Sequence, residues 1–143
     1  MIKVYTSGTW DLFHVGHLNI LKASKKLGDY LVVGVSTDEL IFSYKKHYPI
    51  ISFEDRFKII ESCRYVDEVV KQEILLSIEE IDKINPDILT IGSDWKNKYL
   101  EGIEHFKKNK RVVYFDYTDK VSSTIIRKKL NSIYNKRLCD KID

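Results

Sequence analysis

Two histidines, His14 and His17, stand three residues apart with a glycine, Gly16, between them. Side chains at this spacing on a helix start point to the same side, so both imidazoles can reach one ligand. Such a pair can bind a metal, act as an acid and a base, or donate hydrogen bonds to a phosphate whose charge rises during transfer. A metal needs a third ligand at a suitable spacing, and no cluster of cysteine and histidine follows. The pair could also simply cap or pack a first helical turn, but two histidines beside a glycine favour phosphate chemistry.

The surrounding pattern places this pair at the junction of a strand and a helix. Residues 2–6 alternate apolar side chains and predict a strand, and the apolar spacing of residues 16–27 predicts a helix. Ligands of open α/β sheets bind beyond the carboxyl ends of the strands. A helix start adds unpaired N–H groups and a positive dipole end, which suit a phosphate. Gly8 would let the backbone approach a ligand, and Gly16 would keep the space between the histidines narrow.

The stretch Gly8-Thr9-Trp10-Asp11 followed by His14-Val15-Gly16-His17 resembles the HxGH signature of the nucleotidylyltransferase superfamily. Within that superfamily the chain is most similar to the small cytidylyltransferases of the glycerol-3-phosphate type. Further matching blocks keep their order and approximate spacing to about residue 130: Gly28–Val33, Ser36–Glu39, Arg64–Val69, Asp94-Trp95 and Ser122–Thr124. The resemblance implies catalytic roles for His14 and His17, and nucleotide-binding roles for Gly8, Thr9, Trp10, Asp11 and Gly16. Trp10 could instead be packed, and Asp11 could orient a histidine, approach a metal or form a turn.

The composition is that of one globular domain. The 143 residues are 43% hydrophobic and 31% charged, and the net charge of +3 is weak evidence for a nucleic-acid partner. Cys63 and Cys139 lack the spacing of a metal or redox motif. The chain begins directly with a strand pattern rather than a signal peptide, and no apolar run approaches the roughly 20 residues of a membrane span. We therefore expect a cytoplasmic protein that binds neither nucleic acid nor membrane.

Strand-like and helix-like segments alternate along the whole chain. The expected strands cover residues 2–6, 30–36, 66–70, 88–91 and 111–115. The expected helices cover residues 16–27, 38–42, 53–63, 75–84, 99–108 and 123 to either 130 or 134. This alternation predicts βαβ units with right-handed crossovers. We predict an α/β fold, a Rossmann-like open parallel sheet of about five strands with helices on both faces, in a domain of residues 1–134 followed by a charged tail of residues 135–143.

Polar residues recur where the expected strands end. Ser122, Ser123 and Thr124 precede the last helix and could form a second phosphate cradle, an ordinary N-cap, or both. The resemblance implies that they hold the β- and γ-phosphates of a nucleotide. Asp94 and Trp95 follow a strand and could accept ribose hydroxyls and stack on a base, although the indole could also be a packed plug.

Cations that could meet phosphates lie in two further places. Lys45 and Lys46 fall in an irregular stretch that could close over a polyphosphate, or they could be solvated. The resemblance implies that one lysine of this loop contacts phosphates; we favour Lys46 as the catalytic one and assign Lys45 to phosphate binding. Arg56 and Arg64 suit bidentate phosphate recognition, or could form surface ion pairs. The resemblance places one of these arginines near the acceptor and the block that starts at Arg64 near a dimer contact, so it implies a homodimer.

The chain departs from the resembled family just before its last helix. Tyr117 stands where the family has an arginine that helps to hold the nucleotide or the acceptor phosphate, and Lys120 could compensate. The loop of residues 42–51 also differs from the family pattern. Both departures concern the acceptor more than the transfer step, so we assign Tyr117 and Lys120 to acceptor or phosphate binding.

We predict that the chain transfers CMP from CTP to a phosphorylated small acceptor and releases pyrophosphate, with Mg²⁺ held mainly by phosphates and water and no protein metal site. The acceptor could be glycerol 3-phosphate, a related polyol phosphate, an amino-alcohol phosphate, or an acyl or amide phosphate such as phosphoglutamine. Two other functions stay open: adenylyl transfer from ATP, and a nucleotide-sensing module that has lost turnover.

Overall fold

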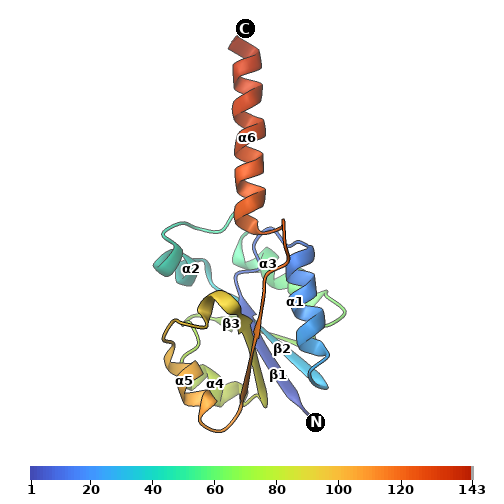
Figure 1. The fold of residues 1–143 in the computed structure, drawn as a ribbon, viewed down its shortest axis with the longest axis vertical. Helices are drawn as coiled ribbons and strands as arrows, with labels where there is room; N and C mark the ends of the chain where they lie inside the picture. Colours follow the sequence, from blue (N-terminus) through green and yellow to red (C-terminus); the bar gives the residue numbers. More distant parts are fainter. Residues whose placement is uncertain (143) are drawn as a thin grey trace.

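Five parallel strands form one sheet in the structure, a computed structural model that describes the backbone of residues 1–142 and the side chains of residues 1–137 (Figure 1). The strands are β1 (Lys3–Gly8), β2 (Tyr30–Ser36), β3 (Glu68–Gln72), β4 (Ile88–Gly92) and β5 (Arg111–Phe115). Their order across the sheet is β3-β2-β1-β4-β5. After β1, the chain adds β2 and β3 on one side of that strand. It then adds β4 and β5 on the other side, so a topological switch point lies between β1 and β4. The predicted open parallel sheet is confirmed.

Helices cover both faces of this sheet, as predicted. They are α1 (Val15–Lys25), α2 (Asp38–Lys45), α3 (Phe53–Glu61), α4 (Ile78–Ile84), the short 3₁₀ helix η1 (Ser93–Trp95), α5 (Glu101–Lys107) and α6 (Ser123–Ile142). Side chains of α1 and α3 pack on one face, and those of α4 and α5 pack on the other. Helix α6 leaves the domain at the end opposite the N-terminus (Figure 1).

The alternation of side chains along the strands builds a core on each face. In β1, Val4 packs toward α1 and α3, whereas its neighbour Tyr5 packs toward α4 and α5. In β2, Val33 and Val32 divide in the same way. A strand that is buried on both faces must be apolar throughout, which explains the continuous apolar run of β2. Gly34 leaves room for the tyrosine, because a Cβ there would lie 2.3 Å from the Tyr5 hydroxyl oxygen.

Several element ends differ from the sequence prediction because turns and caps decide them. Helix α2 continues to Lys45 rather than residue 42, and it ends where Lys46 adopts a left-handed backbone conformation with a φ of 62°. Strand β3 begins at Glu68 rather than residue 66, because the N–H of Val66 still closes a turn on the Cys63 carbonyl at 3.1 Å. Helix α4 begins at Ile78 rather than residue 75, since the side chain of Ser77 caps it.

The last helix is longer than the prediction of an end at residue 130 or 134. Helix α6 continues to Ile142. Leu130 and Tyr134 on this helix are exposed. The predicted tail of residues 135–143 thus lies within a helix as far as Ile142, while Asp143 lies outside the described residues. The proposed domain boundary at residue 134 stays a prediction.

Candidate active site

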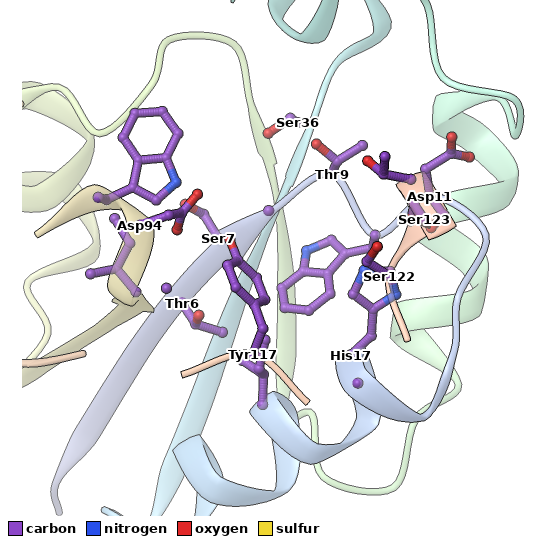
Figure 2. A pocket seen from close by; sticks show the side chains of 18 of the residues that line it. Thr6, Ser7, Thr9, Asp11, His17, Ser36, Asp94, Tyr117, Ser122 and Ser123 are labelled. Carbon is purple, nitrogen blue, oxygen red and sulfur yellow. Dashed lines mark hydrogen bonds between the residues drawn. The ribbon is translucent and has the colours of Figure 1, made fainter. Parts of the chain in front are cut away.

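A pocket of about 510 Å³ opens at the carboxyl ends of the strands, at the switch point between β1 and β4. Gly8 at the end of β1 and Gly92 at the end of β4 both line it. His17 of α1 and Ser122, just before α6, line another side (Figure 2). The structure therefore brings residues from separate strand ends into one cavity of a size that suits a small ligand.

The two imidazoles are held by the start of α1. His14 is the N-cap, and its Nδ1 accepts the N–H of Gly16 at 3.0 Å. The Nδ1 of His17 accepts the N–H of His14 at 3.4 Å, and the two rings stack with centroids 3.9 Å apart. The arrangement is a capping box built from two histidines. The two histidines therefore cap the helix, which was the simpler of the roles considered from the sequence. The cap does not use their Nε2 atoms, which can meet a ligand.

These hydrogen bonds also fix where the proton of each ring lies. An Nδ1 that accepts a hydrogen bond carries no proton, so the neutral ring holds its proton on Nε2. Burial lowers the pKa of His14 below its usual 6.5. Burial, followed by the neighbouring His14 ring, lowers the pKa of His17 to about 3, although the Asp11 carboxylate acts in the opposite direction. At pH 7 both rings are therefore neutral, and each offers one Nε2–H donor.

Two neighbours fix the position of these rings. A Cβ on Gly16 would lie 2.8 Å from Cε1 and 2.9 Å from Nδ1 of His14, so a larger residue would displace that ring from the cap. Trp10 is buried, donates its Nε1–H to the Gly34 carbonyl at 2.9 Å, and meets the His17 ring edge-on at 5.4 Å between centroids. Trp10 is thus a packed wall behind His17, the alternative that the sequence left open, rather than a free nucleotide contact.

Asp11 joins three segments beneath the pocket. It is 1% exposed, and its carboxylate accepts the N–H groups of Ile50 and Ile51, each at 2.9 Å. The guanidinium of Arg127 pairs with the same carboxylate, and the Ser123 hydroxyl donates to the Asp11 carbonyl at 2.6 Å. Both carboxylate oxygens bind protein groups, so Asp11 fixes the loop before α3 and the start of α6. Asp11 also lines the pocket, and its expected nucleotide-binding role stays a prediction.

The start of α6 forms the second side of the pocket. Ser122, Ser123 and Thr124 all line it. The Ser122 hydroxyl accepts the N–H of Ile125 at 3.0 Å and so caps the helix, while Ser123 is bound to the Asp11 carbonyl. The cap is therefore present, and a helix N-terminus that faces a cavity suits a phosphate, so the phosphate cradle stays a prediction.

The sequence analysis missed Arg127. This residue lies in the first turns of α6 and lines the pocket, with its side chain 24% exposed and paired with Asp11. It follows Thr124 by three residues, a spacing that places both side chains on one side of a helix. That spacing was a signal in the sequence that could have identified it.

Of the two adjacent lysines after β2, the structure places Lys45 in the pocket. Lys45 lines the pocket, with its Nζ 3.4 Å from the Thr9 hydroxyl. Burial, followed by the nearby Arg127, lowers the pKa of Lys45, although Asp11 acts in the opposite direction. Lys46 points away and donates to the Ser43 carbonyl at 2.9 Å. The preference for Lys46 is corrected, because α2 extends through Lys45 and turns only at the next residue.

Arg56 is part of the core rather than a phosphate ligand. It is fully buried, and its guanidinium donates to the carbonyls of Ile51 at 2.9 Å, Thr9 at 2.7 Å and Ser36 at 2.8 Å. Asp38 completes the set with an ion pair at 2.6 Å. Arg56 is fully buried, every guanidinium nitrogen binds a protein group, and the residue is not among those that line the pocket, so the expected contact with the acceptor or the triphosphate is corrected.

Two other predicted phosphate contacts also lie away from the pocket. Arg64 is exposed beyond the end of α3, and Lys120 is exposed with a left-handed φ of 63°. Neither residue is among those that line the cavity. The cations that do line it are Lys45 and Arg127.

Asp94 and Tyr117 lie on the side of the pocket beside β4 (Figure 2), and Trp95 lines the pocket next to Asp94. Burial, followed by the adjacent Asp94 carboxylate, raises the pKa of Tyr117 well above its usual 10, so this side chain is a neutral donor. The Trp95 indole meets Tyr44 edge-on at 6.2 Å, and the Tyr44 hydroxyl lies 3.3 Å from that of Thr9. The wall is therefore mainly aromatic, with one carboxylate.

Among the side chains that the structure describes, no three or more of the His, Cys, Asp and Glu type converge on a point that could hold a metal ion. The described helices include none that combines the length and the apolar character of a membrane span.

Comparisons with known proteins agree with this geometry. The model of a family described as cytidylyltransferase-like matches residues 5–129. A glycerol-3-phosphate cytidylyltransferase of Bacillus spizizenii is 40% identical over 136 residues, which cover 93% of this chain and 100% of that protein. An FAD synthase of Pyrococcus abyssi is 43% identical over 94 residues, 65% of this chain and 64% of that protein. Among solved structures, a lipopolysaccharide core biosynthesis protein of Thermoplasma volcanium has a TM-score of 0.67 and 29% identity, covering 82% of this chain and 97% of that one.

Replacing Arg56 with methionine should lower the free energy of unfolding by about 3–5 kcal/mol, because a buried ion pair is broken. Urea denaturation followed by circular dichroism measures the change. The matched variant Arg64→Met removes an exposed arginine and should alter stability by less than about 0.5 kcal/mol. An Arg56→Met protein of normal stability that loses only affinity for a phosphate would contradict the structural role.

His17 should make stability fall in acid. Its pKa is about 3 in the folded chain and near 6.5 in the unfolded chain, so the unfolded chain binds the extra proton between these values. Above pH 6.5 the His17 ring is neutral in both the folded and the unfolded chain, and the free energy of unfolding is not reduced. As the pH falls from 6.5 toward 3, the free energy of unfolding decreases by up to about 1.4 kcal/mol per pH unit. Urea denaturation from pH 7 to 4 should show the wild type losing more stability than His17→Asn. A stability difference that stays constant over this range would exclude the neutral, capping imidazole.

Proposed function

This chain belongs to the cytidylyltransferase-like family, and we propose that it transfers CMP from CTP to a phosphorylated small acceptor with release of pyrophosphate. The observation that carries the proposal is the histidine pair. Two neutral rings, stacked 3.9 Å apart with their Nδ1 atoms bound to the backbone, offer their Nε2–H groups side by side at a helix start. Donors that are fixed before the reaction stabilise charge that grows on phosphate oxygens at no cost of reorganisation.

The proposed step is an in-line displacement at the α-phosphorus. An oxygen of the acceptor phosphate forms the new P–O bond, and the bond between the α-phosphorus and the α–β bridging oxygen breaks with its electron pair leaving on pyrophosphate. His14 and His17 donate to the oxygens of the α-phosphate and to the bridging oxygen. No covalent intermediate with the protein is required, so catalysis rests on positioning and on charge stabilisation.

The remaining pocket residues have supporting roles in this proposal. Ser123 and Thr124, with the N-terminus of α6, hold the leaving pyrophosphate, and Lys45 and Arg127 offset its charge. Asp94 accepts ribose hydroxyls, and Trp95 with Tyr117 forms the wall against the nucleoside. Lys45 takes the place that the sequence analysis gave to Lys46.

We propose that Mg²⁺ reaches this pocket with the nucleotide. No three metal-binding side chains converge on one point among the described residues, which suits an ion that keeps its water and binds mainly to phosphates. When bound, Mg²⁺ would offset phosphate charge.

We further propose that the protein acts as a homodimer in the cytoplasm. The support for the dimer is the resemblance of residues 64–67 to a dimer-contact block, in a segment that lies away from the pocket. The support for the location is the substrate, because nucleoside triphosphates are cytoplasmic metabolites.

Adenylyl transfer from ATP is the second candidate function, favoured by the identity to an FAD synthase. Pyrophosphate release assayed with CTP and with ATP, over a panel of polyol, amino-alcohol, acyl and amide phosphates, separates the two. We expect turnover with CTP and one class of acceptor. Faster turnover with ATP would favour adenylyl transfer, and CTP binding without turnover on any acceptor would favour a sensor.

In the same assay, His17→Ala should lower the turnover rate by about 10²–10³-fold, the usual effect of losing one transition-state donor. Circular dichroism at pH 7 verifies that the variant is folded. A folded His17→Ala protein with a near-normal rate would remove the histidine pair from the mechanism.

The two adjacent lysines provide a matched pair of variants. Lys45→Met should lower kcat/KM for the nucleotide by about 10²-fold, because a cation that faces the phosphates is removed. Lys46→Met should stay within about twofold of the wild type, because that side chain points to the Ser43 carbonyl. The opposite order of effects would restore Lys46 as the functional residue.

A further inference from the structure

A buried glutamine, Gln72, links two hydroxyl groups of the pocket. It ends β3, is 1% exposed, and lies behind the pocket rather than in its wall. The Ser36 hydroxyl donates to its Oε1 at 2.8 Å. Its Nε2 donates to the Ser7 hydroxyl oxygen at 2.9 Å and to Glu80 of α4 at 3.1 Å. Ser7 and Ser36 both line the pocket (Figure 2).

The directions of these hydrogen bonds follow from Glu80. Burial raises the pKa of Glu80, while the hydrogen bonds from Tyr5 and Gln72 act in the opposite direction and favour the ionised form. An ionised carboxylate can only accept, so the amide nitrogen of Gln72 faces it and the amide oxygen faces Ser36. The buried hydroxyl of Tyr5 donates to the same carboxylate. Gln72 therefore always donates to Ser7, and the Ser7 proton must go to another partner. In an empty pocket that partner can be the Tyr5 oxygen, since Ser7 lies close enough to lower the Tyr5 pKa.

The Ser7 and Ser36 hydroxyls, which both bind Gln72, lie on one side of the two histidines. Ser36 ends β2, and Gln72 ends β3, so this part of the pocket belongs to the β2–β3 half of the sheet. Asp94, proposed to accept the ribose hydroxyls, follows β4 in the other half of the sheet. The start of α6, proposed to hold pyrophosphate, is bound to Asp11 after β1 through Ser123 and Arg127. The β2–β3 end is the part of the pocket that neither of these groups occupies, so we expect the acceptor to approach from there.

We propose that the Ser7 hydroxyl, oriented by Gln72, donates a hydrogen bond to an oxygen of the acceptor beyond its phosphate. Gln72 and Glu80 are then positioning residues for the reaction, and the inference rests on the proposed transfer to a phosphorylated acceptor. The recognising group is neutral and donates, so it favours an acceptor whose far end presents a hydroxyl or carbonyl oxygen.

Glu80→Gln tests this arrangement with little change of shape. An amide at position 80 can donate, which allows the Gln72 amide to turn its oxygen toward Ser7 and draw the Ser7 proton away from the ligand. We expect the KM for the acceptor to rise about tenfold, as for the loss of one hydrogen bond, while the KM for CTP is unchanged. Ser7→Ala should give the same selective rise, and the double variant should be no worse than either single one. The control is Glu79→Gln, an exposed neighbour on α4 outside the network, which should leave both KM values unchanged.

The outcomes separate this inference from the function on which it rests. A wild-type protein that transfers CMP to no phosphorylated acceptor overturns both. A wild type that turns over, with Glu80→Gln and Ser7→Ala leaving the acceptor KM unchanged or raising both KM values equally, overturns the positioning role alone. If Glu80→Gln lowers the melting temperature enough to unfold the chain, the Ser7→Ala result decides, because Ser7 lies at the pocket surface. A selective rise in the acceptor KM supports the proposal.

Discussion

The first N–H groups of α1 require hydrogen-bond partners, and in this chain the partners are imidazole nitrogens. Because the Nδ1 atoms of His14 and His17 are occupied by backbone donors, only the Nε2–H groups remain for a ligand. Their direction is therefore set by the helix and not by the substrate. Two neutral donors held in this way are organised before any phosphate arrives, which is the condition under which hydrogen bonds assist a charged transition state most. In the proposed reaction, helix capping and turnover would thus depend on the same two side chains.

The loop that delivers these histidines is strained, and its surroundings hold it in place. Trp10 and Leu12 adopt left-handed backbone conformations with φ values of 56° and 51°, which bulky residues rarely adopt. Asp11 lies between them, and its carboxylate binds two backbone N–H groups and Arg127. Arg56 binds the carbonyl just before Trp10 at 2.7 Å. Asp11 and Arg56 are buried, and their hydrogen bonds hold this backbone in its strained conformation.

Local patterns in the sequence were enough to predict those strands and helices whose formation depends on residues close together in the chain. The apolar runs of β2 and β5 predicted both strands with the observed ends. The run is clearest in β2, a central strand that is buried on both faces. The burial of Arg56 could not be predicted in this way, since its partners Thr9 and Ser36 lie 47 and 20 residues away. The choice between Lys45 and Lys46 depended on the residue at which α2 turns, which is the least predictable property of a helix.

The replacement of the family arginine by Tyr117 changes where the positive charge of the pocket originates. Tyr117 is a neutral donor beside Asp94, so the wall near β4 contributes no cation of its own. The guanidinium that does line the pocket comes from Arg127 on α6, and in the structure it is paired with Asp11. A triphosphate at the start of α6 would compete with Asp11 for this guanidinium. Asp11 also holds the loop before α3, so in the proposed reaction a bound triphosphate would meet a guanidinium that is linked through Asp11 to that loop.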